Sequence, residues 1–223
     1  MNNKRKIWEP IKANDYPTQE ERTFMNKKWR EKVGDKIMVV INGVGGVGKD
    51  TFVECVAGLL GGCVDPVTEF EREIVQNIST VDLIKRAAKL LGWTGDKSNK
   101  DRKFLSDLKK VCCEYNDLPY KIVQMEYEWG DFKILFVHCR EPEEIQRFVD
   151  GFNAKTLLIK RDNISIPDNK SDLNVENYKY DYVIENNGTR KDLLKSADKF
   201  IKWLGCEDWI RDIDNESDSM RRG

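Results

Sequence analysis

A glycine-rich stretch followed by a lysine has the spacing most suggestive of chemistry in this sequence. Residues 43–51 read GVGGVGKDT and contain the pattern G-x-x-x-x-G-K, in which backbone N–H groups and the lysine surround phosphate groups. The residue after Lys49 is Asp50, whereas the usual residue there is a serine or threonine that binds Mg²⁺. Thr51 comes one position later. The loop therefore either binds a nucleotide through an altered metal ligand or has lost this chemistry.

Electrostatics favours the altered metal ligand. A carboxylate about 4 Å from a phosphate oxygen is repelled by about 4 kcal/mol per unit charge at an effective dielectric constant near 20. A Mg²⁺ ion between the two groups reverses the sign, because this cation prefers carboxylate and phosphate oxygens. We therefore predict that Asp50 is a Mg²⁺ ligand. The predicted nucleotide-binding residues are Gly43, Gly45, Gly46, Val47, Gly48, Lys49, Asp50 and Thr51.

Length, charge and cysteine spacing argue against several classes of protein. A chain of 223 residues suits one α/β domain with small insertions. Its 38 Lys and Arg residues balance 39 Asp and Glu residues, so the composition predicts no nucleic-acid partner and no membrane partner. No run reaches the roughly 18 apolar residues of a membrane span, and the six cysteines lack the spacing of zinc sites. We expect a soluble, cytoplasmic protein with reduced thiols, and its oligomeric state stays open.

Buried strands and amphipathic helices alternate along the central part of the chain. Apolar runs predict strands at 36–42, 72–79, 132–139, 154–161 and, shorter, near 180–185. Helical periodicity predicts helices at 51–60, 80–92, 100–117, 119–130, 141–152 and 190–205. This alternation indicates an α/β fold with a parallel sheet and helices on both faces. The glycine-rich loop then lies at the carboxyl end of the first strand, where such sheets bind ligands.

Three parts of the chain differ in composition. Residues 1–34 are predicted to form a polar arm with one amphipathic helix, residues 35–205 the α/β domain, and residues 206–223 a polar tail. Within the domain, residues 162–180 are polar and aperiodic, which is typical of a mobile loop. We predict one domain that carries the site and two polar extensions.

Four motifs occur in the same order as in a known family of kinases. They are the loop ending in GKDT, DRKFLSDLK at 101–109, HCREPEEI at 138–145 and YDYVIENNGTRKDLL at 180–194. In these motifs residues 36–203 resemble P-loop kinases of the bacteriophage deoxynucleoside monophosphate kinase type. The last motif is also similar to dephospho-CoA kinases, and the loop to animal-type phosphomevalonate kinases. The resemblance implies a P-loop NTPase-type three-layer sandwich with a five-stranded parallel sheet in the order 2-3-1-4-5.

The resemblance also implies roles for arginines outside the loop. Arg140 follows the third strand and would bind the acceptor phosphate through its bidentate guanidinium group. Arg102 would contact the acceptor from the helix at 100–117, and Arg161 would face the transferred phosphoryl group. Lys49, Arg140 and Arg161 are thus the predicted catalytic residues, and Arg102 and Arg140 the predicted acceptor-binding residues.

By the same resemblance, Asn187 and Gly188 would line the donor adenine. The helices at about 80–130 would bind the acceptor, and residues 162–180 would form a lid that excludes water. His138 stands where members of this family carry an aspartate after the third strand, and it is the only histidine of the chain. We expect His138 to be a hydrogen-bonded core residue.

The predicted function is phosphoryl transfer from ATP, with Mg²⁺, to a small phosphorylated acceptor, first of all a (deoxy)nucleoside monophosphate. No general base is required, because an acceptor phosphate is already an anionic nucleophile. One alternative is a kinase for another small acceptor such as dephospho-CoA. The other is a non-catalytic P-loop regulator that only binds the nucleotide. The arginines predicted at strand ends favour an enzyme, since a protein that only binds ATP has little use for them.

Overall fold

A five-stranded parallel sheet forms the centre of the protein. The computed structural model describes residues 35–64, 71–96, 98–162 and 175–209. The strands of the sheet are β1 (Ile37–Asn42), β4 (Val75–Ser79), β5 (Ile134–His138), β6 (Lys155–Lys160) and β7 (Tyr182–Glu185). Their spatial order is β4-β5-β1-β6-β7, with every pair parallel. Counted along the chain within this sheet, the order is 2-3-1-4-5, which confirms the predicted topology.

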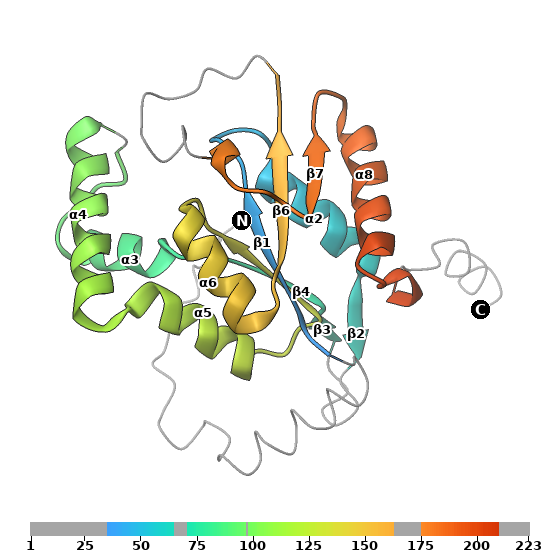
Figure 1. Ribbon diagram of the computed structural model, residues 1–223, viewed down its shortest axis with the longest axis horizontal. Helices are drawn as coiled ribbons and strands as arrows, with labels where there is room; N and C mark the ends of the chain where they lie inside the picture. Colours follow the sequence, from blue (N-terminus) through green and yellow to red (C-terminus); the bar gives the residue numbers. More distant parts are fainter. Residues whose placement is uncertain (1–34, 65–70, 97, 163–174, 210–223) are drawn as a thin grey trace, which may run out of the picture.

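Helices cover both faces of the sheet. They are α2 (Lys49–Leu60), α3 (Asp82–Leu90), α4 (Asn99–Asn116), α5 (Leu118–Trp129), α6 (Pro142–Phe152) and α8 (Arg190–Trp203), with 3-10 turns at Val175–Asn177 (η2) and Glu207–Trp209 (η3). Helices α2 and α8 pack on one face through a core that includes Phe52, Phe136 and Phe200. Helices α5 and α6 pack on the other face through Val123 and Phe148. The molecule is therefore the predicted three-layer sandwich, with α3 and α4 beside the sheet (Figure 1).

The strands are as apolar as burial on both faces requires. In β1 the five residues that follow Ile37 are all buried, and alternate side chains enter the two cores. The run ends at Asn42, a polar residue that is fully buried. The chain then turns into the glycine-rich loop and enters α2, as the sequence predicts.

The predicted strand at 72–79 is wrong in its first half. Residues Glu71–Glu73 form β3, which pairs antiparallel with β2 (Gly62–Val64) in a separate two-stranded sheet. Only Val75–Ser79 joins the central sheet, after the buried Ile74. The charged run ERE does not suit a strand that is covered on both faces, so the chain changes sheet where the apolar residues begin.

Parts of the sequence predictions fall outside the described residues. These are the arm at 1–34, residues 163–174 of the predicted lid loop, and residues 210–223 of the tail. The end of the lid loop is described: the Tyr180 hydroxyl donates to the Val175 carbonyl, and the Tyr178 hydroxyl donates to Gln146 of α6. No helix within the described ranges is both long and apolar enough to cross a membrane.

Candidate active site

The glycine-rich loop has the backbone conformation that its glycines permit. Gly46 has φ 84° and Gly48 has φ 96°, both in the left-handed region that other residues rarely adopt. Gly48 is also the N-cap of α2, and no side chain caps the first N–H groups of this helix. Such N–H groups and the positive end of the helix favour a bound anion.

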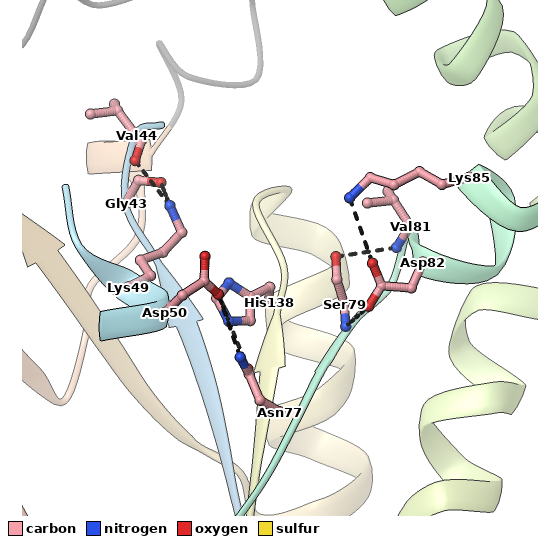
Figure 2. A network of polar contacts seen from close by, with 10 residues as sticks. All are labelled: Gly43, Val44, Lys49, Asp50, Asn77, Ser79, Val81, Asp82, Lys85 and His138. Atoms are coloured by element: carbon pink, nitrogen blue, oxygen red, sulfur yellow. Dashed lines mark hydrogen bonds and ion pairs between the residues drawn. The ribbon is translucent and has the colours of Figure 1, made fainter. Parts of the chain in front are cut away.

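Lys49 lies against the loop. Its ammonium group donates hydrogen bonds to the carbonyl oxygens of Gly43 at 2.6 Å and Val44 at 2.9 Å (Figure 2). The charge is thus held over the same turn whose N–H groups would bind phosphate. A phosphate that enters the loop can replace these carbonyls as the acceptor, because a charged oxygen is the stronger partner.

Two asparagines that sequence reasoning missed hold the loop from the ends of β1 and β7. Asn42 accepts the Gly43 N–H at 2.7 Å and donates to the Arg140 carbonyl at 3.2 Å. Asn186, after β7, is buried and donates to the Val47 carbonyl at 2.8 Å. The signal in the sequence was an asparagine at or directly after the end of a predicted strand, in VVIN and in VIEN.

The Asp50 carboxylate contacts side chains from two other strands. Its Oδ1 accepts a hydrogen bond from Asn77 Nδ2 at 3.4 Å, and His138 Nε2 lies 3.5 Å from the same oxygen. His138 Nε2 is also 2.8 Å from Asn77 Oδ1 (Figure 2). The Asp50 side chain is 80% exposed, whereas that of His138 is 16% exposed. Asp50 therefore reaches solvent while its inner oxygen is held from β4 and β5.

His138 is a hydrogen-bonded residue, as expected, but it lies at a cavity rather than in the core. Burial lowers the pKa of His138 below its ordinary value, and the nearby Asp50 carboxylate opposes this shift. The positive charge of the Lys49 ammonium group also lowers the pKa of His138. The imidazole is consequently neutral at pH 7.

A cavity of about 670 Å³ opens beside the loop. Its wall comes from the loop, the carboxyl ends of β4 and β5, and the facing sides of α3 and α4. The polar and charged side chains in this wall include Asp50, Asn77, Asp82, Lys85, Lys109 and Arg140. The volume is in the range of small-molecule sites. The part of the wall that comes from α3 and α4 lies in the predicted acceptor-binding segment.

Arg140 and Lys109 bring positive charge to the cavity. Lys109 forms an ion pair of 2.7 Å with Glu144, and both side chains are mostly buried. The Cys139 thiol donates to Glu144 at 3.2 Å, and burial together with this carboxylate raises the pKa of Cys139 well above its ordinary value. Cys139 is therefore a neutral thiol that fixes Glu144, which in turn holds the Lys109 ammonium.

Several predicted site residues lie elsewhere. Within the described structure, Thr51, Arg102 and Arg161 are not in the wall of this cavity. The Asn187 amide donates to the Asp162 carboxylate at 2.7 Å and accepts the Asp162 N–H at 2.8 Å, so it ties its turn to the end of β6.

Gly188 precedes the N-terminus of α8. Thr189 and Asp192 form a capping box there. A Cβ atom at Gly188 would lie 2.9 Å from an Asp192 carboxylate oxygen. The turn is thus a helix cap.

The donor set fits a Mg²⁺ ion that is shared with a nucleotide. Among the described residues no group of three or more His, Cys, Asp or Glu side chains could hold a metal ion alone. Mg²⁺ commonly takes one or two carboxylates and completes its shell with phosphate oxygens and water. The exposed Asp50 carboxylate beside the loop suits that arrangement.

Comparisons with known proteins leave the family open. No protein-family model matches the chain, and the comparison with curated proteins gave no match. Among solved structures, a sugar kinase from Janibacter sp., solved without ligand, is 14% identical, with a TM-score of 0.42 over 79% of this chain and 99% of that chain. A similarity this distant carries no information on the reaction.

Proposed function

We propose that this protein is a Mg²⁺-dependent kinase that transfers a phosphoryl group from ATP to a small phosphorylated acceptor, first of all a (deoxy)nucleoside monophosphate. The observation that carries this proposal is the opening of the lysine-bearing loop and of Arg140 onto one cavity of about 670 Å³. A cation on the donor side and another on the acceptor side of a single cavity are what transfer between two phosphates requires.

The residues of the chain divide into a donor side and an acceptor side. On the donor side, the N–H groups of the loop and of the first turn of α2 bind the β- and γ-phosphates, and Lys49 exchanges its two carbonyl partners for phosphate oxygens. On the acceptor side, Arg140 binds the acceptor phosphate. The acceptor oxygen attacks the γ-phosphorus in line, the bond between this phosphorus and the β–γ bridging oxygen breaks, and ADP leaves with that oxygen. No side chain has to remove a proton.

Mg²⁺, held by Asp50, would neutralise the charge on the β- and γ-phosphates. Arg161, after β6, is assigned the transferred phosphoryl group, and Arg102 the acceptor. Asn187 and Gly188 are assigned the donor adenine. The support for these four assignments is the resemblance of their motifs to nucleotide kinases, and they form part of the proposal.

A second candidate is a kinase for another small acceptor. Among the described residues no Phe, Tyr or Trp side chain lines the cavity, although aromatic rings are the usual partners of a nucleobase. Lys85 and Lys109 also line the wall, and each is ion-paired with a carboxylate, Asp82 and Glu144. The absence of an aromatic ring from the described wall is the observation that supports this second candidate.

A panel of acceptors separates these possibilities. ADP release is measured with ATP and nucleoside monophosphates, deoxynucleoside monophosphates, dephospho-CoA and phosphorylated acids, with Lys49→Met as the control. Stimulation by one acceptor class, absent in the control, supports the kinase and identifies its substrate. ATP binding in calorimetry without ADP release for any acceptor would indicate a regulator. Absence of ATP binding would contradict the proposal altogether.

A further inference from the structure

Asn77 and His138 come from neighbouring strands and meet Asp50 at the edge of the cavity. In the pairing of β4 with β5, Ser79 is opposite His138 and Asn77 is opposite Phe136. Asn77 therefore lies two positions before Ser79, the residue that pairs with His138. The two side chains project from the sheet toward the first turn of α2 (Figure 2). Three elements that are distant in the sequence thus converge on one carboxylate.

The chemistry of the three groups fixes the direction of their hydrogen bonds. A carboxylate can only accept, so the amide nitrogen of Asn77 must face Asp50. The amide oxygen of Asn77 then faces His138 Nε2, which must carry the hydrogen in this pair. Donation therefore runs from His138 to Asn77 and from Asn77 to Asp50. A reversed amide would place its oxygen against the carboxylate, which is repulsive.

We propose that Asn77, held by His138, is a positioning residue that fixes the Asp50 carboxylate for a divalent cation shared with the nucleotide phosphates. This inference rests on the proposed function. Asp50 is an exposed side chain that would otherwise sample several rotamers. A hydrogen bond from Asn77 to one oxygen orients the carboxylate and leaves its other oxygen for the metal.

The exposure of these side chains separates this role from a structural one. Asn77 and Asp50 are both exposed, and hydrogen bonds between exposed groups contribute little to folding stability. Loss of the Asn77 amide should therefore leave the thermal unfolding temperature almost unchanged. The effect is expected in metal affinity, because the orientation of Asp50 is lost.

The test measures binding of Mn²⁺ to the full-length protein in saturating ADP by electron paramagnetic resonance. Asn77→Leu has nearly the shape of asparagine and removes both hydrogen bonds. We expect Mn²⁺ binding to weaken by about fivefold, the change that the loss of one ordinary hydrogen bond produces. The matched control is Gln76→Leu on the same strand, which breaks a 3.0 Å amide–carboxylate bond to Glu126 away from the cavity. Gln76→Leu should leave Mn²⁺ affinity within about twofold.

Two further comparisons identify Asp50 as the group through which Asn77 acts. In an Asp50→Ala background, Asn77→Leu should cause no additional loss of Mn²⁺ affinity. His138→Leu should weaken Mn²⁺ binding, whereas His138→Gln should retain it, because a glutamine nitrogen can donate from the position of Nε2.

The outcomes separate this inference from the proposed function. Unchanged Mn²⁺ affinity in Asn77→Leu, with wild-type protein that binds Mn²⁺ and ADP, overturns the positioning role and leaves the kinase proposal intact. An additive loss in the Asp50→Ala background also overturns it. Wild-type protein that binds no Mn²⁺ in the presence of ADP contradicts the kinase proposal and this inference together.

Discussion

Three glycines of the loop allow the cost of its backbone conformation to be measured in separate steps. A Cβ atom at Gly45 would meet no heavy atom within 4 Å, and its φ is not in the left-handed region. Gly46 also has open space, but its φ is 84°. Gly48 has φ 96°, and a Cβ atom there would lie 2.5 Å from Asn186 Nδ2. Alanine at position 45 therefore adds no strain, and alanine at position 46 adds dihedral strain. Alanine at position 48 adds dihedral strain and a steric clash.

The magnitudes follow from these contacts. Gly45→Ala should change the free energy of unfolding by less than about 1 kcal/mol. Gly46→Ala should cost about 1–2 kcal/mol, the penalty of the left-handed region. Gly48→Ala carries the same penalty and also displaces Asn186 from the Val47 carbonyl, which leaves a buried acceptor unpaired for about 1–3 kcal/mol more. The expected total for Gly48→Ala is about 2–5 kcal/mol.

The assay is urea unfolding of the ligand-free protein, followed by circular dichroism and tryptophan fluorescence. Stability is the appropriate quantity, because an added methyl group in the loop could also obstruct a phosphate and so confuse an activity assay. The expected order of destabilisation is Gly48→Ala, then Gly46→Ala, then Gly45→Ala. If Gly48→Ala is as stable as Gly45→Ala, the loop does not have this conformation in solution and Asn186 does not hold it.

Four further expectations concern the charged groups of the site. Lys49→Met should lower kcat for ADP formation by at least about 100-fold and weaken ATP binding in calorimetry. Arg140→Ala should raise KM for the acceptor by about tenfold, while ATP affinity stays within about twofold. Asp50→Ala should raise the Mg²⁺ concentration for half-maximal rate by about tenfold, which corresponds to about 1.4 kcal/mol of metal binding. The single imidazole signal of His138 in ¹H NMR of the metal-free protein should titrate with a pKa below 6.5, and Asp50→Ala should lower that pKa further.

Each expectation can fail in a specific way. Turnover of Lys49→Met within a few-fold of wild type would contradict a phosphate-binding role of the loop. Equal losses of ATP affinity and of acceptor affinity in Arg140→Ala would show that Arg140 does not act on the acceptor side alone. Unchanged Mg²⁺ dependence in Asp50→Ala would make Asp50 only a helix-end residue. The lowered pKa of His138 also makes the stability of the protein depend on pH. The unfolded chain binds the proton more readily, so the neutral imidazole contributes stability above pH 6.5 that is lost as the pH falls through the folded pKa.

The sequence predicted the central sheet well because burial on both faces leaves a strong local pattern. Strands such as Ile37–Asn42 and Ile134–His138 are mainly apolar runs. Their order in the sheet was implied by the resemblance to P-loop kinases. The hairpin of β2 and β3 was missed because each of its strands has only three residues and β3 is fully charged. Short strands of this kind have no periodicity that differs from a loop.

Residues of the site were harder to predict where their role depends on which side of a strand end they face. The motif YDYVIENNGT directed attention to Asn187, whereas the structure shows that Asn186 contacts the loop and Asn187 contacts Asp162. Successive residues of an extended chain point to opposite sides, so neighbouring asparagines have different partners, and the sequence alone does not indicate which of them faces the loop. Asn77 was missed for a similar reason, because its partners come from β5 and α2 and are distant in the sequence.

A neutral His138 beside Asp50 avoids the electrostatic repulsion that a second carboxylate would cause. In many P-loop proteins a hydroxyl group on the loop and a carboxylate at a strand end share the Mg²⁺ ion. Here the carboxylate is in the first turn of α2, and a neutral imidazole and an amide stand at the strand ends. A second carboxylate about 4 Å from Asp50 would add about 4 kcal/mol of repulsion before any metal binds. Neutral donors avoid that repulsion. In the proposed arrangement they also orient Asp50, which would account for an aspartate after Lys49 together with a histidine at position 138.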